Sequence, residues 1–194
     1  MTWGPEMDAI LTEPALTWAL RSFLALLFAT AAMSKLANSE EFYGVVRNFR
    51  LIPDGPSRAV AVALPVVELA VAVGLLLSPL AVPAAVAAAL LLAGFAAAIA
   101  INVIRGRTFI DCGCMRHGMK QPVSWLMVAR NGLLVLMALG VVALLPSVRP
   151  AGAADLFVGL SAGAIAMMLY FSASMLGGLM AAQGSTLAAK GRRA

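Results

Sequence analysis

The stretch ELAVAVGLLLSPLAVPAAVAAALLLAGFAAAIAINVIR, residues 68–105, decides the fold, because no charged residue lies between Glu68 and Arg105. A helix needs roughly 20 mainly apolar residues to cross the hydrocarbon core of a bilayer. The stretch is long enough for two such helices. Pro79 and Pro83 lie where the first would end and the second begin. It is therefore predicted to form a tight hairpin of two membrane-spanning helices.

The rest of the chain has the same apolar character. Of its 194 residues, 62% are hydrophobic and only 12% are charged, whereas a soluble domain has about 25% charged residues. The fold class predicted is all-α: an integral membrane helical bundle with a four-helix core plus a fifth transmembrane helix. One transmembrane domain is expected over residues 1–182, followed by a short basic tail, 183–194. The five predicted spans, each placed within a few residues, are 15–35, 58–77, 82–104, 123–146 and 155–182.

The connection after the first span, NSEEFYGVVRNFRLIP at residues 38–53, is more than a plain loop. Asn38 and Glu41 have capping-box spacing, and Pro53 supplies a stop. A short amphipathic helix lying in the membrane interface is predicted. Its role is either to anchor the first span or to cover a neighbouring loop. The apolar residues at helical spacing are Phe42, Val45, Val46 and Phe49.

Charge distribution predicts the orientation. The net charge of +5 fits basic loops at an anionic membrane face rather than nucleic-acid binding. The predicted spans leave only Arg149 on one face and eleven basic residues on the other. By the positive-inside rule the N-terminus is outside, the C-terminus is cytoplasmic, and no signal peptide is expected to be cleaved. The eleven are Lys35, Arg47, Arg50, Arg58, Arg105, Arg107, Arg116, Lys120, Lys190, Arg192 and Arg193.

Both cysteines of the chain, Cys112 and Cys114, lie one residue apart in the segment FIDCGCMRHGM, residues 109–119. A disulfide between them would close a small ring, which Gly113 makes easier because it has no side chain to clash. Strained disulfides tend to exchange rather than to stabilise, and nearby basic residues favour the reactive thiolate. The pattern predicts a thiol–disulfide exchange site, although two ordinary buried small residues would give the same letters.

A metal site is the second interpretation of this segment. His117, the only histidine, completes a C-x-C-x-x-H spacing with Cys112 and Cys114, and Met115 and Met119 add soft sulfur. Thiolate and thioether ligands would suit Cu(I). A closed structural zinc site, in contrast, needs four ligands, and the chain has no other cysteine or histidine.

Polar residues inside the predicted spans are candidate supporting residues. The spans that carry Glu68 and Arg130 enter the membrane from the same face, and the depths of the two residues differ by only about 5 Å. A buried Glu68–Arg130 pair is therefore expected. Asn102 and Asn131 would complete a polar network beneath the cysteine segment. Such a network either fixes helix register or acts in function, with Glu68 moving protons or Arg130 holding a quinone carbonyl.

Two further residue patterns concern packing. Arg21, inside the first span, is expected to extend its head group to the outer interface. Gly159 and Gly163 form a G-x-x-x-G pattern in the fifth span. This spacing permits close approach of a second helix. It serves either packing within the chain or dimerisation.

These features resemble a known family. SKLANSEEFYGVVRNFRLIP followed by VALPVVELAVAVGLLL, residues 34–53 and 62–77, resembles the DoxX-like membrane proteins. DCGC at residues 111–114, followed by QPVSWLMVARNGLLVLMAL at residues 121–139, resembles the MauE methylamine utilisation proteins. The resemblance covers most of residues 17–146. It implies a bacterial inner-membrane protein with Cys112 and Cys114 as its redox pair.

The resemblance also implies a process and partners. MauE-like proteins are associated with maturation of methylamine dehydrogenase, whose small subunit is periplasmic and rich in disulfides. The implied partner is a thioredoxin-like protein of the MauD type. Apart from the resemblance, a quinone is a candidate cofactor, because a relay across the membrane with one cysteine pair needs either such a cofactor or movement of the pair between faces. A periplasmic client conflicts with the charge rule, which puts Cys112 and Cys114 on the cytoplasmic face. A copper-handling protein and a non-catalytic scaffold for the thioredoxin-like partner stay open as alternatives.

Overall fold

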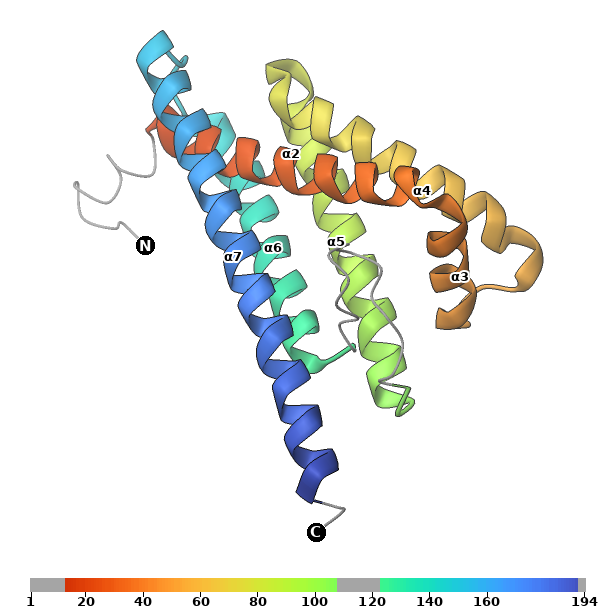
Figure 1. The fold of residues 1–194 in the computed structure, drawn as a ribbon. Coiled ribbons are helices and arrows are strands. Elements are labelled where there is room, and N and C mark those ends of the chain that lie inside the picture. Colours follow the sequence, from red (N-terminus) through yellow and green to blue (C-terminus); the bar gives the residue numbers. More distant parts are fainter. Residues whose placement is uncertain (1–12, 108–122, 192–194) are drawn as a thin grey trace.

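The computed structural model describes residues 13–107 and 123–191, with the side chains of residues 177–191 left out of the description. All regular secondary structure in its described part is helical, and the chain can be followed in Figure 1 from red to blue. The helices are α2 (Pro14–Ala37), α3 (Ser39–Phe49), α4 (Asp54–Leu76), α5 (Ala81–Ile104), α6 (Trp125–Leu144) and α7 (Ala153–Gly191), with short 3-10 turns at Ser78–Leu80 and Leu145–Ser147.

Five of these helices are long and apolar enough to cross a membrane, which confirms the predicted fold class. Large apolar side chains point outward, as a lipid solvent allows. Leu90, Leu126 and Phe157 are 70%, 76% and 74% exposed. Helix α7 continues to Gly191, through most of the segment predicted as a tail. The five candidate spans are Pro14–Ala37, Gly55–Leu76, Ser78–Ile104, Trp125–Ser147 and Ala153–Leu176.

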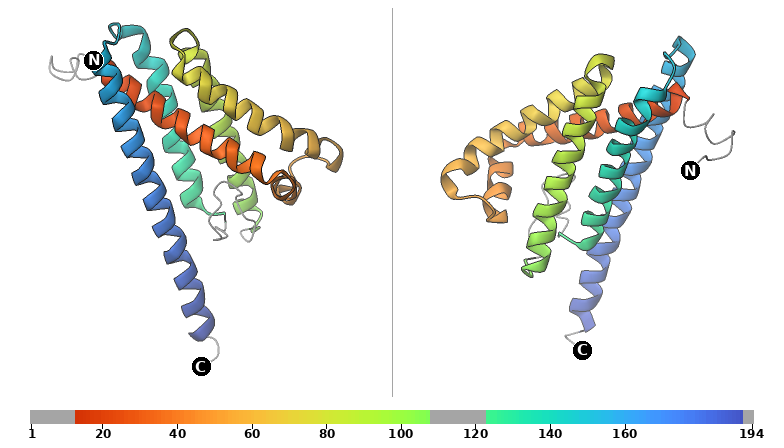
Figure 2. Two further views of the ribbon diagram at one scale, coloured as in Figure 1. Left: turned by 45° about the horizontal axis from the view of Figure 1, so that its top comes forward. Right: turned by 180° about the vertical axis from the view of Figure 1, so that it is seen from behind.

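Helix α2 is the centre of the arrangement, because it contacts α4, α5, α6 and α7. Figure 1 shows α2 lying obliquely across α5, α6 and α7, with α4 beside it. The two further views in Figure 2 show the α2–α4 pair diverging from the other three long helices. Buried side chains of all five helices, including Phe28, Leu75, Ala88, Leu134 and Met167, form one apolar core where they meet.

The G-x-x-x-G pattern packs within the chain, on the face of α2. A Cβ atom at Gly159 would overlap the Cβ of Trp18, and one at Gly163 would overlap the hydroxyl of Ser22. The hydroxyl of Ser22 also donates a hydrogen bond to the carbonyl of Gly159, at 3.2 Å. These two glycines therefore let α7 approach the backbone of α2 closely, which decides between the two predicted roles.

Arg21, whose head group was expected at the outer interface, is enclosed by the protein and is only 3% exposed. Its Nε donates to the carbonyl of Leu75 at 2.7 Å, and its Nη2 to that of Leu76 at 3.3 Å. The last carbonyls of a helix have no partner within it, so Arg21 of α2 satisfies the end of α4. The guanidinium also lies 3.9 Å from the ring centroid of Trp18.

An exposed ion-pair cluster joins the starts of α2 and α7 at the same end of the molecule. Arg149 donates to Asp155 at 3.0 Å and to Glu13 at 3.1 Å. The hydrogen bond with Asp155 is the main reason why the pKa of Arg149 lies above its ordinary value. Arg149 therefore keeps its positive charge on the face where the predicted spans leave it as the single basic residue.

The interfacial helix is present as α3 and has the apolar spacing that predicted it. The proposed capping box is absent, because Asn38 makes no side-chain cap bond and instead donates its amide to the carbonyl of Ser34, at 3.1 Å. Helix α3 ends at Arg50, whose left-handed backbone (φ 48°) turns the chain toward α4. Phe42 is its buried anchor, 7% exposed.

Candidate functional site

The predicted redox and metal residues Cys112, Cys114 and His117 lie outside the described residues. Both ends of the segment that carries them are described. After α5 the amide of Arg107 donates to the carbonyl of Asn102 at 2.9 Å, with Gly106 at a φ of 70°. At the other end Val123 is 1% exposed, just before α6. The segment therefore starts and ends on ordered backbone.

A small apolar cluster, separate from the main core, lies at this place. Ile99 of α5, Val123 and Met127 of α6 are buried together, with Phe49 of α3 packed against them. The guanidinium of Arg105 also donates to the carbonyl of Arg50, at 3.5 Å. The C-terminal end of the interfacial helix is thus packed beside both ends of the cysteine segment.

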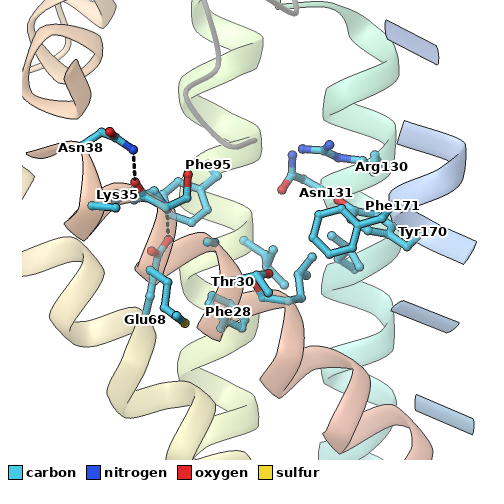
Figure 3. Close-up of a pocket in the computed structure, with 17 residues that line it drawn as sticks. Phe28, Thr30, Lys35, Asn38, Glu68, Phe95, Arg130, Asn131, Tyr170 and Phe171 are labelled. Atoms are coloured by element: carbon cyan, nitrogen blue, oxygen red, sulfur yellow. Dashed lines mark hydrogen bonds and ion pairs between the residues drawn. The ribbon is translucent and has the colours of Figure 1, made fainter. Parts of the chain in front are cut away.

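A pocket of about 430 Å³ opens between the five long helices, on the side of α2 that faces α6 and α7. Its wall is largely apolar and includes Phe28, Phe95, Tyr170 and Phe171. Figure 3 shows the polar side chains in two groups. Lys35 and Glu68 lie on one side of the pocket, and Arg130 and Asn131 of α6 lie on the other, beside the aromatic pair of α7.

Glu68 is paired with Lys35, not with Arg130 as expected. The ammonium of Lys35 donates to Oε1 of Glu68, and the two side chains are 5% and 1% exposed. Similar depth along α4 and α6 would bring Glu68 and Arg130 together only if these two helices were neighbours. Instead α2 crosses beside α4 and brings its last turn onto Glu68. The lysine, counted from the sequence as a basic loop residue, is an interior residue.

Arg130 lies in the same pocket without an anionic partner among the described residues. Its Cζ atom is 5.9 Å from the ring centroid of Tyr170, which is a favourable position for a cation over an aromatic face. Its Nε is buried and has no hydrogen-bond partner in the described part of the chain. Asn131, 4% exposed, donates its amide to the carbonyl of Met127 at 2.9 Å.

Asn102 lies apart from the other three predicted network residues. It is fully buried and donates its amide to the carbonyl of Ala98 at 3.0 Å, and it does not line the pocket. Its own backbone carbonyl holds Arg107, where the cysteine segment leaves α5. Glu68, Arg130 and Asn131 therefore share one site, while Asn102 supports the base of the neighbouring segment.

Lys35 and the aromatic residues of the pocket were not among the residues predicted from the sequence. Helical spacing could not single out Tyr170 or Phe171, because α7 is apolar on all sides. The position of Lys35 was a usable indication, because a lysine at the end of a predicted span can point either to water or into the bundle. In the described ranges no three His, Cys, Asp or Glu side chains are grouped as a metal site would need. The predicted copper ligands fall outside those ranges.

Comparison with known proteins gives a consistent result. The family model described as methylamine utilisation protein MauE matches residues 13–145, which run from the start of α2 to the end of α6. The methylamine utilization proteins MauE of Paracoccus denitrificans and Paracoccus versutus are 63% and 65% identical to this chain over 186 residues, covering 96% of it and 100% of each relative. The MauE of Methylophilus methylotrophus is 35% identical over 176 residues, 90% of this chain and 93% of the relative. No solved structure matches.

Proposed function

Because this chain belongs to the MauE family of methylamine utilisation proteins, we propose that it is a membrane thiol–disulfide exchange protein with Cys112 and Cys114 as its redox pair. The observation that carries the proposal is the placement of the cysteines. A chain of 194 residues keeps its only two thiols one residue apart, in the segment that joins α5 to α6. Such a short ring constrains little of the unfolded chain, so a stabilising role is poorly served.

The proposed reaction is an exchange of one disulfide for another. A client thiolate attacks the Cys112–Cys114 disulfide and forms a mixed disulfide with one cysteine, while the other cysteine is released as a thiolate. A second client thiolate then attacks the client sulfur of the mixed disulfide and releases the remaining cysteine. The client gains one disulfide, and Cys112 and Cys114 leave as two thiols. In the opposite direction the reduced pair opens a wrong client disulfide by the same steps. The basic residues Arg107, Arg116 and Lys120 favour the thiolate form of the pair.

The proposed process is maturation of an extracytoplasmic protein, with the small subunit of methylamine dehydrogenase as the client. The proposed partner is a thioredoxin-like protein of the MauD type. Both follow from the family resemblance, and the methylamine utilisation context of the relatives supports them. The proposed location is the bacterial inner membrane, with the N-terminus outside and the C-terminus cytoplasmic.

Helix α3 is packed beside the two described ends of the cysteine segment. The two ends of the segment are held by the Asn102–Arg107 hydrogen bond and by the cluster of Ile99, Val123 and Met127. Helix α3 packs against this cluster through Phe49 alone among its apolar residues. We therefore propose that α3 has the second of its predicted roles and borders the redox segment rather than only anchoring α2.

The redox state of Cys112 and Cys114 in native membranes tests the proposal. Alkylation followed by measurement of the mass shift should show both the dithiol and the disulfide form, and their ratio should change when the client is expressed. A Cys112→Ser, Cys114→Ser variant should fail to support client maturation. Adding Ser147→Cys to this variant should not restore maturation, because a thiol elsewhere in the chain does not replace the pair. Normal maturation with the cysteine-free variant would replace exchange by the scaffold role. Thiols that stay reduced until a copper chelator is added would favour the copper-handling role.

A further inference from the structure

Two residues that line the pocket between the long helices each have a buried polar atom without a hydrogen-bond partner among the described residues. The two atoms are Oε2 of Glu68, which accepts, and Nε of Arg130, which donates. Glu68 is fully buried, and both residues line the pocket. A buried polar group without a partner costs free energy, and hydrocarbon supplies no water to replace that partner. A ligand that satisfies both atoms from the pocket needs an acceptor for Arg130 and a donor for Glu68.

The remaining wall defines what else the ligand must be. Phe28, Phe95, Tyr170 and Phe171 contribute flat apolar surfaces. These suit a ring, because aromatic faces stack or meet edge to face with other rings. The volume of about 430 Å³ lies in the range of roughly 300–1,000 Å³ typical of small-molecule pockets. All these residues belong to helices apolar enough to span a membrane, so the ligand is soluble in lipid.

The charges of the pocket favour an uncharged ligand over a lipid phosphate. Lys35 is already neutralised by Glu68, which leaves Arg130 as a single cation. The free oxygen of Glu68 in the same pocket would repel a phosphate oxygen. A neutral ring that offers an oxygen to Arg130 and a hydroxyl to Glu68 meets no such repulsion.

We propose that this pocket binds the ring of a lipid-soluble quinone and of its quinol. In the quinone form a ring carbonyl accepts the Nε–H of Arg130, and in the quinol form a ring hydroxyl donates to Oε2 of Glu68. The two unsatisfied atoms thus serve the two redox forms of one ligand. Arg130 and Glu68 are binding residues in this scheme, and Lys35 is a positioning residue that holds the carboxylate.

The use of this ligand rests on the proposed function, although its binding does not. Each client disulfide formed leaves Cys112 and Cys114 as two thiols. Their reoxidation breaks two S–H bonds, forms one S–S bond and releases two electrons and two protons. Reduction of one quinone to its quinol takes up the same two electrons and two protons, so a lipid-soluble quinone is a complete oxidant for the pair.

Binding of decylubiquinone to the full-length protein in phosphatidylcholine nanodiscs tests the proposal, with isothermal titration as the measurement. Saturable binding is expected beyond that of empty nanodiscs. Arg130→Met, which removes the donor, should weaken it by at least about tenfold, the effect of losing a hydrogen bond to a charged group. The matched control is Arg58→Met, because Arg58 is exposed, contacts Glu40 and the ring of Tyr43, and does not line the pocket. This variant should bind like the wild type.

Two further variants keep the test decisive. Ala31→Phe places a large side chain in the pocket without changing any charge, and it should abolish binding even if Arg130→Met fails to fold. The Cys112→Ser, Cys114→Ser variant should bind decylubiquinone normally. If this variant binds decylubiquinone but Cys112 and Cys114 of the wild type never change between dithiol and disulfide, the proposed function fails while the pocket assignment stands.

The opposite results overturn the pocket assignment. One is decylubiquinone binding that is equal in the wild type, Arg130→Met and Ala31→Phe. Another is binding of phosphatidylglycerol that depends on Arg130, with no binding of decylubiquinone, which would assign the pocket to a lipid phosphate.

Discussion

Lys35 and Glu68 form an ion pair that is buried almost completely, 33 residues apart in the chain and on the two helices that cross at the centre of the molecule. The lysine lies in the last turn of α2 and the carboxylate in the middle of α4. The rings of Phe42 and Phe95 lie 5.4 and 5.2 Å from the ammonium. The pair therefore joins the α2–α4 crossing to the interfacial helix and to one wall of the pocket.

Removing one member of this pair should destabilise the protein strongly. Lys35→Met leaves the Glu68 carboxylate buried without a cation, and loss of one partner of a buried pair costs about 3–5 kcal/mol. The double variant Lys35→Met, Glu68→Gln leaves no buried charge and should recover much of that loss. Thermal unfolding in detergent measures both. A single variant as stable as the wild type would show that Lys35 reaches water instead.

The contact between α7 and α2 depends on two glycines. Gly159→Ala and Gly163→Ala each add a Cβ atom where Trp18 or Ser22 already lies. Overpacking of this kind costs typically about 1–3 kcal/mol. Gly140→Ala on α6 is the matched control, since nothing lies within 4 Å of its added atom, and it should be neutral or slightly stabilising. Equal unfolding temperatures for Gly163→Ala and Gly140→Ala would contradict this packing.

Arg21 should be needed for the end of α4 as well as for its own helix. Arg21→Met removes the donors to Leu75 and Leu76, and each hydrogen bond to a charged group contributes about 1.5–3 kcal/mol. Arg21→Lys retains the charge but lacks the fork that reaches two carbonyls, so its unfolding temperature should lie between those of Met and Arg. A Lys variant as stable as the wild type would show that charge alone suffices.

The fold class followed from the sequence because hydropathy has a direct physical cause. Runs such as residues 69–104 contain no charge, and only a spanning helix satisfies their backbone in lipid. The hairpin of α4 and α5 was placed within a few residues, since Pro79 and Pro83 break the longest run, whereas α7 continues to Gly191, beyond its predicted end at residue 182. Such signals are local along the chain. They need no knowledge of which helix lies beside which.

The pairing of polar residues could not be predicted in the same way. The depths of Glu68 and Arg130 are local quantities, whereas their partners depend on the crossing of α2 over its neighbours. Gly159 and Arg21 take part in the contacts of α2 with α7 and α4. The G-x-x-x-G pattern is visible in the sequence, but it does not say which helix packs against it, and the contact of Arg21 with the end of α4 has no sequence pattern. Three residues of the predicted network, Glu68, Arg130 and Asn131, nevertheless lie around one pocket, because groups costly to expose to lipid face the interior.

The orientation can be tested at the two ends of the bundle. Asn48→Cys on α3 and Ser147→Cys before Arg149 are both at exposed positions. Each would be made in a Cys112→Ser, Cys114→Ser background. Without Lys35, which is an interior residue, ten basic residues remain on the predicted cytoplasmic face. They predict that a membrane-impermeant maleimide labels Ser147→Cys in intact spheroplasts and labels Asn48→Cys only after lysis. A permeant maleimide, as the control for accessibility, should label both without lysis.

The reverse labelling would matter for the chemistry as much as for the topology. Phe49, one residue from Asn48, packs beside both ends of the cysteine segment. Asn48→Cys therefore reports the membrane face at which that segment leaves α5 and enters α6. If only Asn48→Cys is labelled in intact spheroplasts, the charge rule is wrong for this chain. The redox pair then faces the compartment of the proposed client and can exchange with it directly. The predicted pattern instead requires electrons to cross the bilayer, for which a lipid-soluble quinone in the pocket is a suitable carrier.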